Sequence, residues 1–210
     1  MMLTEESIKV QHAPWLPPPS WSRLRRKTHA LVYHWAAMSD PSHTTQLNMY
    51  DYMYRNLKTK AYHAIVQDKI IRCMHWDMSA GALGLNRLED YPVETKQRFG
   101  GVWPDSVTIN ILMMEDDKEG RYSIQTANNG AMLGAFLCKR YDLHPTEHVL
   151  RHSDVTGKGT KPEGHPLYVK GELPCPRFFV ENNPAWEMFR LRIREILVME
   201  NDGRWNAADD

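Results

Sequence analysis

Apolar residues along the chain form two kinds of pattern: short continuous runs, and longer stretches with a repeat of three or four residues. The continuous runs, which are typical of buried β-strands, cover residues 30–35, 61–67, 69–74, 106–114 and 148–152. Two of them flank a turn at Asp68, which predicts a β-hairpin. The repeating stretches, which predict amphipathic helices, cover residues 47–57, 124–141 and 183–199. Strands that alternate with helices indicate an α/β fold, a single domain with a central mixed β-sheet flanked by α-helices.

The two later helices have the clearest core-facing sides. The residues expected to face the core are Ile124, Ala127, Ala131, Ala135 and Phe136 in the first, and Trp186, Phe189, Ile193 and Ile196 in the second. Gly130 and Gly134 lower the helix propensity, so we expect them to allow a close approach to the sheet. Cys138 fits a small core residue. Asn183 followed by Pro184 predicts the start of the last helix.

Composition narrows the class of protein. The 210 residues include 26 Lys and Arg and 26 Asp and Glu, so charge gives no argument for nucleic acid or an anionic membrane as a partner. No run approaches the roughly 18 apolar residues of a membrane span. The first residues lack the basic and apolar regions of a secretory signal. Three cysteines cannot all pair with one another, which argues against a disulfide scaffold. We therefore expect a protein made in the cytoplasm without a signal peptide.

Two histidines and a cysteine are the main candidates for chemistry. His34 lies in the run 30–35, His152 ends the run 148–152, and Cys175 follows a segment rich in proline and glycine. Neutral imidazole and thiolate are the side chains that Zn²⁺ prefers, and three protein ligands leave a fourth position open for water. A lone histidine in a buried strand is more often a hydrogen-bonded core residue. The set of three instead favours a catalytic zinc site.

The residues around these positions resemble a known family. The stretches that carry the likeness are H-S-D-V-T-G-K at 152–158, C-P-R-F at 175–178, V-Y-H-W at 32–35, A-Y-H-A-I-V at 61–66 and, more weakly, residues 106–114. These stretches, taken in their order along the chain, are similar to motifs of the zinc-dependent N-acetylmuramoyl-L-alanine amidases that share the peptidoglycan-recognition-protein fold. Phage endolysins of the amidase type belong to that family. The resemblance therefore implies that fold for residues 30–180.

The resemblance also implies roles for five residues. These are zinc ligation by His34, His152 and Cys175, and catalysis by Tyr62 and Lys158. Tyr62 would orient the water or hydrogen-bond the tetrahedral intermediate. Lys158 would stabilise the developing oxyanion, as preorganised donors do in acyl transfer generally.

Other positions receive supporting roles or none. Some relatives have a glutamate where this chain has Asn110, which implies the subgroup that works with tyrosine and lysine and leaves Asn110 without a role. His63 would be a packing residue, and Asp154 would support the ligand loop. His75 and Trp76 lie in a segment expected to be mostly loop and could line the substrate groove.

The reaction implied by the resemblance is hydrolysis of the amide between N-acetylmuramic acid and L-alanine in peptidoglycan, as in cell-wall lysis by a phage or prophage enzyme. Two alternatives stay open. Relatives that have lost a zinc ligand bind peptidoglycan without cutting it, and a thiol hydrolase could use Cys175 as its nucleophile. All three ligand positions are filled here, which favours an enzyme. We expect a monomer that acts on the bacterial cell wall, with peptidoglycan as its partner, no nucleic acid and no membrane span.

The expected domain organisation follows from composition and from the resemblance together. It comprises an extended N-terminal arm (1–29), an amidase catalytic domain (30–200) with an insertion loop (159–174), and a polar tail (201–210). The insertion separates Lys158 from Cys175 by more residues than in most relatives. It could form a wall of the substrate groove or a surface loop without a role.

Overall fold

The computed structural model of the protein describes residues 2–13, 27–36, 45–55, 61–85, 87–157 and 174–202. Six strands of this part form one sheet: β1 (Val10–His12), β2 (Ala30–Trp35), β3 (Ala64–Val66), β4 (Ile70–Arg72), β5 (Thr108–Met113) and β6 (Val149–Arg151). The helices are α1 (Gln46–Arg55), α2 (Val93–Arg98), α3 (Ile124–Tyr141), α4 (Pro145–His148), α5 (His152–Thr156), α6 (Arg177–Glu181) and α7 (Asn183–Asn201), with 3-10 turns η2 (Leu88–Asp90) and η3 (Pro104–Ser106).

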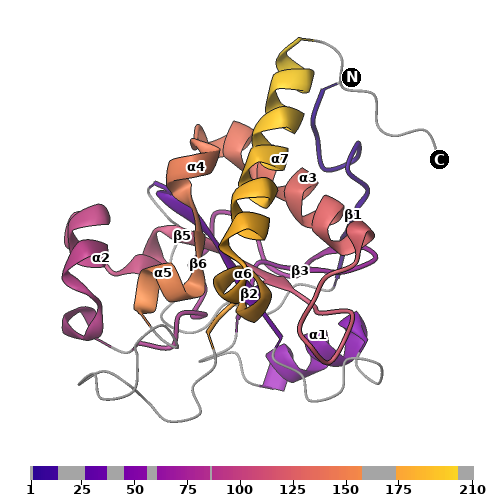
Figure 1. Ribbon diagram of the computed structural model, residues 1–210. Coiled ribbons are helices and arrows are strands. Elements are labelled where there is room, and N and C mark those ends of the chain that lie inside the picture. The colour runs from indigo at the N-terminus through magenta and orange to yellow at the C-terminus, as the bar shows by residue number, and fades with distance from the viewer. Residues whose placement is uncertain are drawn as a thin grey trace.

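The sheet is mixed, and its parallel part positions the candidate site. The strand order is β1-β4-β3-β5-β2-β6. Strands β3 and β4 form the predicted antiparallel hairpin, whereas the other neighbouring pairs are parallel. Since β3, β5, β2 and β6 all run in one direction, their carboxyl ends meet at a common edge of the sheet (Figure 1). Both candidate histidine ligands lie at that edge.

Helices α3 and α7 pack on one face of the sheet, as Figure 1 shows. Alternate residues of a strand point to opposite faces. Leu31 and Tyr33 of β2 therefore join the core with α3 and α7, while Ala30 and Val32 pack on the opposite face. The same alternation directs His34 to that opposite face, away from α3 and α7.

The close approach predicted for the glycines of α3 is confirmed. The Tyr33 hydroxyl donates a 2.9 Å hydrogen bond to the carbonyl oxygen of Gly130. A Cβ at Gly134 would lie 2.6 Å from the Tyr33 hydroxyl oxygen and 2.8 Å from Cδ1 of Ile193. No real side chain fits at those distances, so Gly134 sets the spacing between α3, the sheet and α7.

The α/β prediction is confirmed, with differences at the helix ends. All four apolar residues predicted for the core side of α7 are buried. In α3 the prediction is wrong for Ile124, the first residue of the helix, which is 83% exposed. The N-cap of α7 is Asn182 rather than Asn183, and its side-chain oxygen accepts a hydrogen bond from the Ala185 N–H.

Residues 2–13 include a strand of the sheet, whereas the predicted N-terminal arm contains no strand. Strand β1 pairs in parallel with β4, and Glu5 accepts hydrogen bonds from the Arg72 guanidinium and the Trp76 indole N–H. Trp76 is fully buried, so the prediction that it lines a substrate groove is wrong. The proline-rich segment at 14–21 and residues 203–210 lie outside the described residues, and the arm and tail boundaries stay predictions.

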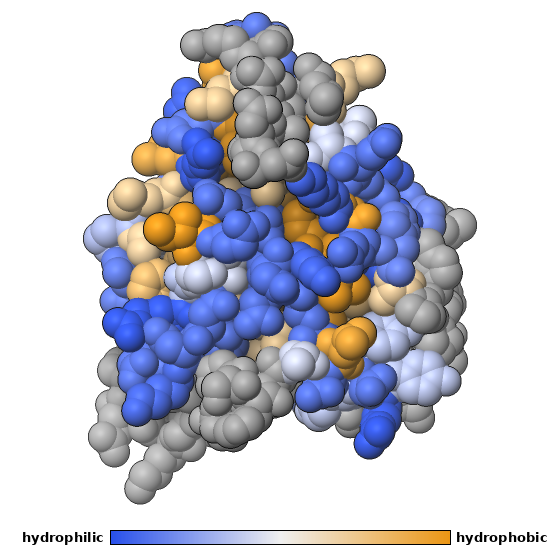
Figure 2. Space-filling model, turned by 90° about the vertical axis from the view of Figure 1, so that its right-hand side faces the viewer, coloured by the Kyte–Doolittle hydropathy of each residue, from blue (hydrophilic) through white to orange (hydrophobic). Residues whose placement is uncertain are grey.

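The face of the molecule shown in Figure 2 carries a mixture of hydrophilic and hydrophobic residues. On the face shown in Figure 2, hydrophobic residues are broken up by hydrophilic ones, as is usual for a folded chain. Within the described ranges, no helix has the combination of length and apolar character that crossing a bilayer requires.

Candidate metal centre and active site

The register of two parallel strands brings the candidate histidines together. Strand β2 pairs with β6 so that Tyr33 lies opposite Arg151. The next residues in each chain segment are His34 and His152, and their ring centroids are 4.7 Å apart. The pairing of β2 with β6 thus brings together two residues that are far apart in the sequence.

Cys175 completes the group. One potential ligand atom from each of His34, His152 and Cys175 lies within 4.8 Å of the other two. Tetrahedral zinc with nitrogen ligands at about 2.0–2.1 Å and sulfur at about 2.3 Å needs ligand atoms roughly 3.5 Å apart. Small side-chain movements suffice to close the observed set around an ion, so the residues present fit zinc.

The second ring nitrogen of each histidine already has a hydrogen-bond partner. Nε2 of His34 lies 2.9 Å from Oδ1 of Asn110. Nε2 of His152 lies 3.1 Å from the carbonyl oxygen of Leu83. In each ring Nε2 is therefore engaged within the protein, and Nδ1 is the other potential ligand atom.

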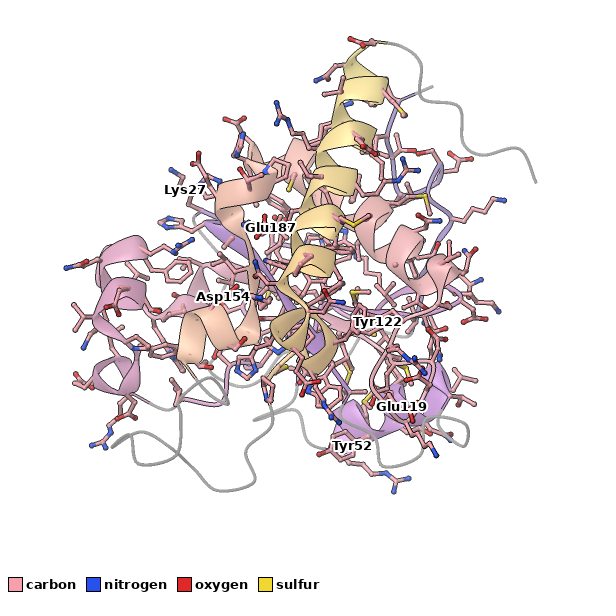
Figure 3. The ribbon with its side chains drawn as sticks, viewed as in Figure 1. Lys27, Tyr52, Glu119, Tyr122, Asp154 and Glu187 are labelled. Atoms are coloured by element: carbon pink, nitrogen blue, oxygen red, sulfur yellow. The ribbon has the colours of Figure 1, made fainter. Side chains whose placement is uncertain are left out.

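The segment that carries Cys175 is attached to the start of α5. The Ser153 N–H donates a 2.8 Å hydrogen bond to the carbonyl oxygen of Cys175. Just beyond Cys175, Phe178 and Phe179 of α6 pack against the ring of Tyr122, whose position is marked in Figure 3. This aromatic cluster holds α6, and hence the cysteine, beside the sheet edge.

Tyr62 lies next to the candidate ligands. Its ring packs edge-on against His34 with centroids 4.9 Å apart, and the side chain is 6% exposed. Burial raises the pKa of the Tyr62 phenol well above its ordinary value, and the nearby Cys175 raises it further. The phenol is therefore protonated at neutral pH and can donate a hydrogen bond.

Lys158 and the insertion lie outside the described residues. The description stops at Gly157, which has a left-handed backbone (φ 69°) and ends α5, and resumes at Pro174. The roles predicted for Lys158 and for the loop 159–174 therefore stay predictions.

The two residues expected to have supporting roles are both held by hydrogen bonds. His63 is fully buried; its Nδ1 accepts from the Asn110 N–H (3.0 Å) and its Nε2 donates to the Met78 carbonyl oxygen (2.8 Å). Asp154, labelled in Figure 3, accepts from the backbone N–H and the guanidinium of Arg151. The contacts of Asp154 hold the start of α5, where His152 is located.

Sequence reasoning missed Asp105 and gave Asn110 no role. Both side chains are buried: Asn110 is fully buried and Asp105 is 2% exposed. Nδ2 of Asn110 lies 3.5 Å from Oδ1 of Asp105, which also accepts from the N–H groups of Ala82 (3.1 Å) and Leu83 (3.3 Å). A polar residue within the apolar run V-T-I-N-I-L was a usable signal, because buried amides require partners.

Comparison with known proteins agrees with the sequence motifs. A family model described as N-acetylmuramoyl-L-alanine amidase matches residues 24–164, more than half of the chain. This range includes His34, Tyr62, His152 and Lys158 and ends before Cys175. A comparison with curated proteins returns no match.

Solved structures share the fold at low sequence identity. PlyL aligns with a TM-score of 0.61 and 17% identity over 88% of this chain and 96% of its own. The Staphylococcus aureus hydrolase AmiA, solved in complex with its ligand, gives 0.59 and 16% over 93% and 85%. The N-acetylmuramoyl-L-alanine amidase LysC from Clostridium intestinale gives 0.52 and 15% over 88% and 97%. These likenesses support the fold assignment.

Proposed function

The chain belongs to the N-acetylmuramoyl-L-alanine amidase family, and we propose that it cleaves the amide between N-acetylmuramic acid and L-alanine of peptidoglycan with zinc held by His34, His152 and Cys175. The observation that carries this proposal is the convergence of the three potential ligand atoms within 4.8 Å. Two imidazoles and a thiolate form a donor set typical of zinc, with room for a fourth ligand.

Zinc in such a site would supply Lewis-acid activation of water and of the scissile carbonyl. The chain's own part is to present Nδ1 of His34 and of His152, since both Nε2 atoms are engaged elsewhere. Cys175 would bind as the thiolate and reduce the net charge of the site.

Tyr62 is the candidate donor to the substrate. A phenol that stays protonated at neutral pH can donate to the carbonyl oxygen as that atom gains negative charge. Lys158 follows directly after Gly157, where α5 ends, and we propose that its ammonium stabilises the same developing charge. Preorganised donors act strongly in acyl transfer because they need no reorganisation during the reaction.

A digest of intact peptidoglycan tests the proposal. Purified protein should release stem peptides with a free L-alanine amino terminus, as identified by mass spectrometry. Chelator should abolish the release and added zinc should restore it. Cleavage at another bond would refute the substrate assignment.

The same digest separates the two alternative functions. Cleavage that persists in chelator would instead favour Cys175 as a nucleophile. Binding to peptidoglycan without cleavage would favour a recognition module. We also propose a lytic role at the cell wall and a phage or prophage origin, because endolysins of the amidase type belong to this family.

A further inference from the structure

We propose that Asp105 positions both candidate zinc ligands, acting through Asn110 on His34 and through the Leu83 carbonyl on His152. In this arrangement each imidazole carries its proton on Nε2 before any metal binds, so both Nδ1 lone pairs face the metal position. The inference rests on the zinc site of the proposed function and adds residues that no ligand motif contains.

The orientation of the Asn110 amide determines the tautomer of His34. Nδ2 of Asn110 faces three oxygens, the Ala80 carbonyl at 3.4 Å, the Thr108 hydroxyl at 3.4 Å and Oδ1 of Asp105 at 3.5 Å. An amide turned the other way would place its oxygen against the carbonyl and carboxylate oxygens, which repel it. Oδ1 therefore faces His34, and because this oxygen can only accept, Nε2 of His34 must donate.

A backbone carbonyl determines the tautomer of His152 in the same way. The Leu83 oxygen, 3.1 Å from Nε2 of His152, can only accept a hydrogen bond. Leu83 is held in place because its own N–H donates to Oδ1 of Asp105. The adjacent Ala82 N–H donates to the same oxygen, so two successive peptide groups are anchored there.

Asp105 thus links the two histidines through one carboxyl oxygen. All three donors, from Asn110, Ala82 and Leu83, converge on Oδ1. Asp105 is located in η3, immediately before β5, and Asn110 is within β5. Asn110, which contacts His34, is therefore held within the sheet, and hydrogen-bonded support of this kind orients metal ligands.

The tautomers can be read directly in the metal-free wild-type protein. Long-range ¹H–¹⁵N correlation spectra at pH 8 distinguish a protonated Nε2 from a protonated Nδ1 in each ring. We expect the Nε2–H form for both His34 and His152. Either ring in the Nδ1–H form would overturn the proposal without any variant being made.

Variants then test whether the network affects metal binding. Asn110→Leu and Asp105→Leu remove the partners at similar size, and zinc should bind about 10- to 100-fold more weakly, the usual effect of losing an outer partner of a ligand. Asp105→Asn keeps an accepting oxygen and should hold zinc within about 3-fold of wild type, a small change on that scale. Competition with a chromophoric chelator measures these constants.

A second buried asparagine provides the matched control. Nδ2 of Asn129 donates to the carbonyl oxygens of Gln67 and Asp68 in the β3–β4 hairpin, away from the candidate ligands. Asn129→Leu should lower the stability yet leave both tautomers and the zinc constant unchanged. If Asn129→Leu and Asn110→Leu weakened zinc binding equally, the role of Asn110 would be general packing and the proposal would be wrong.

The outcomes distinguish this inference from the proposed function. Failure of the wild-type protein to bind zinc would refute the zinc amidase proposal, while the tautomers would still be measurable. Normal zinc binding by wild type with unchanged binding by the folded Asn110→Leu and Asp105→Leu variants would refute the positioning role alone.

Discussion

The Ser153 N–H donates a 2.8 Å hydrogen bond to the carbonyl oxygen of Cys175, which ties the segment of the second candidate ligand to that of the third. The described segments on the two sides of the predicted insertion, which end at Gly157 and resume at Pro174, are therefore joined by this bond. A loop with its ends fixed this way costs little to lengthen, about 0.6 kcal/mol per doubling of its length.

We expect the insertion to contribute to substrate binding rather than to the stability of the fold. Replacing residues 160–173 with a short Gly/Ser linker should keep the zinc content and the thermal stability, because the ends of the loop are already held together. Cleavage of intact peptidoglycan should become slower, with a smaller effect on a short soluble muropeptide. Kinetics on intact peptidoglycan identical to wild type would leave the loop without a role.

Metal binding should depend on one cysteine of the three. Cys175→Ser should remove most of the bound zinc, as measured by elemental analysis, since a serine hydroxyl is a far poorer ligand than a thiolate. Cys73→Ser and Cys138→Ser are the matched controls: burial raises the pKa of each thiol to about 12, and neither lies in the candidate site. Loss of zinc in either control would contradict the assignment.

Catalysis should depend on Tyr62 and Lys158 without affecting metal content. Tyr62→Phe and Lys158→Ala should each lower the turnover number by about 10²-fold or more, the scale for losing a donor to a transition state. Zinc content should stay at the wild-type value in both. A Tyr62→Phe variant with full turnover would exclude the phenol as the donor.

The spacing of α3 from the sheet should not tolerate a methyl group. Gly134→Ala would place its Cβ 2.6 Å from the Tyr33 hydroxyl oxygen, so the helix must shift. We expect a loss of about 1–3 kcal/mol in the free energy of unfolding, typical of overpacking. Gly130→Ala is the control, since its nearest contact is the flexible end of Met113 at 3.1 Å, and it should cost less.

Asp105 should make stability depend on pH. Burial raises the pKa of its carboxyl to about 7 in the folded protein, above the unfolded value of 3.8. The folded state therefore binds this proton more tightly than the unfolded state does. The contribution of Asp105 to stability is fully present below pH 3.8 and is lost as the pH rises through 7. In denaturant titrations of metal-free protein, wild type should lose stability relative to Asp105→Asn between those limits. A difference that does not change with pH would contradict this origin.

Sequence patterns predicted strands β2 to β6 and the two long helices, because residues that face the core recur at a fixed spacing along each element. The apolar face of α7 was predicted residue by residue, since an exposed amphipathic helix shows its core side clearly. Strand β1 was missed because three residues, two of them exposed, carry no period. Its position depends on pairing with β4, which is a tertiary contact.

The candidate site was predictable only in part, for a similar reason. Motifs identified His34, His152 and Cys175, whose side chains have a recognisable chemistry. The Leu83 carbonyl is backbone, so residue type says nothing of its contact with His152. Asp105 looked like an ordinary turn residue, because its burial arises only when the loop at 82–83 folds over it.

Strand β6 has three residues and lies at the edge of the sheet, and its pairing with β2 decides whether two ligands meet. A slip of one residue would turn His152 to the other face and separate it from His34. Zinc would bind well to the correct register alone, and anything that binds one state selectively increases its population. A bound metal would therefore stabilise the correct alignment of β6 against a slipped one, so ligand binding and strand register would be coupled.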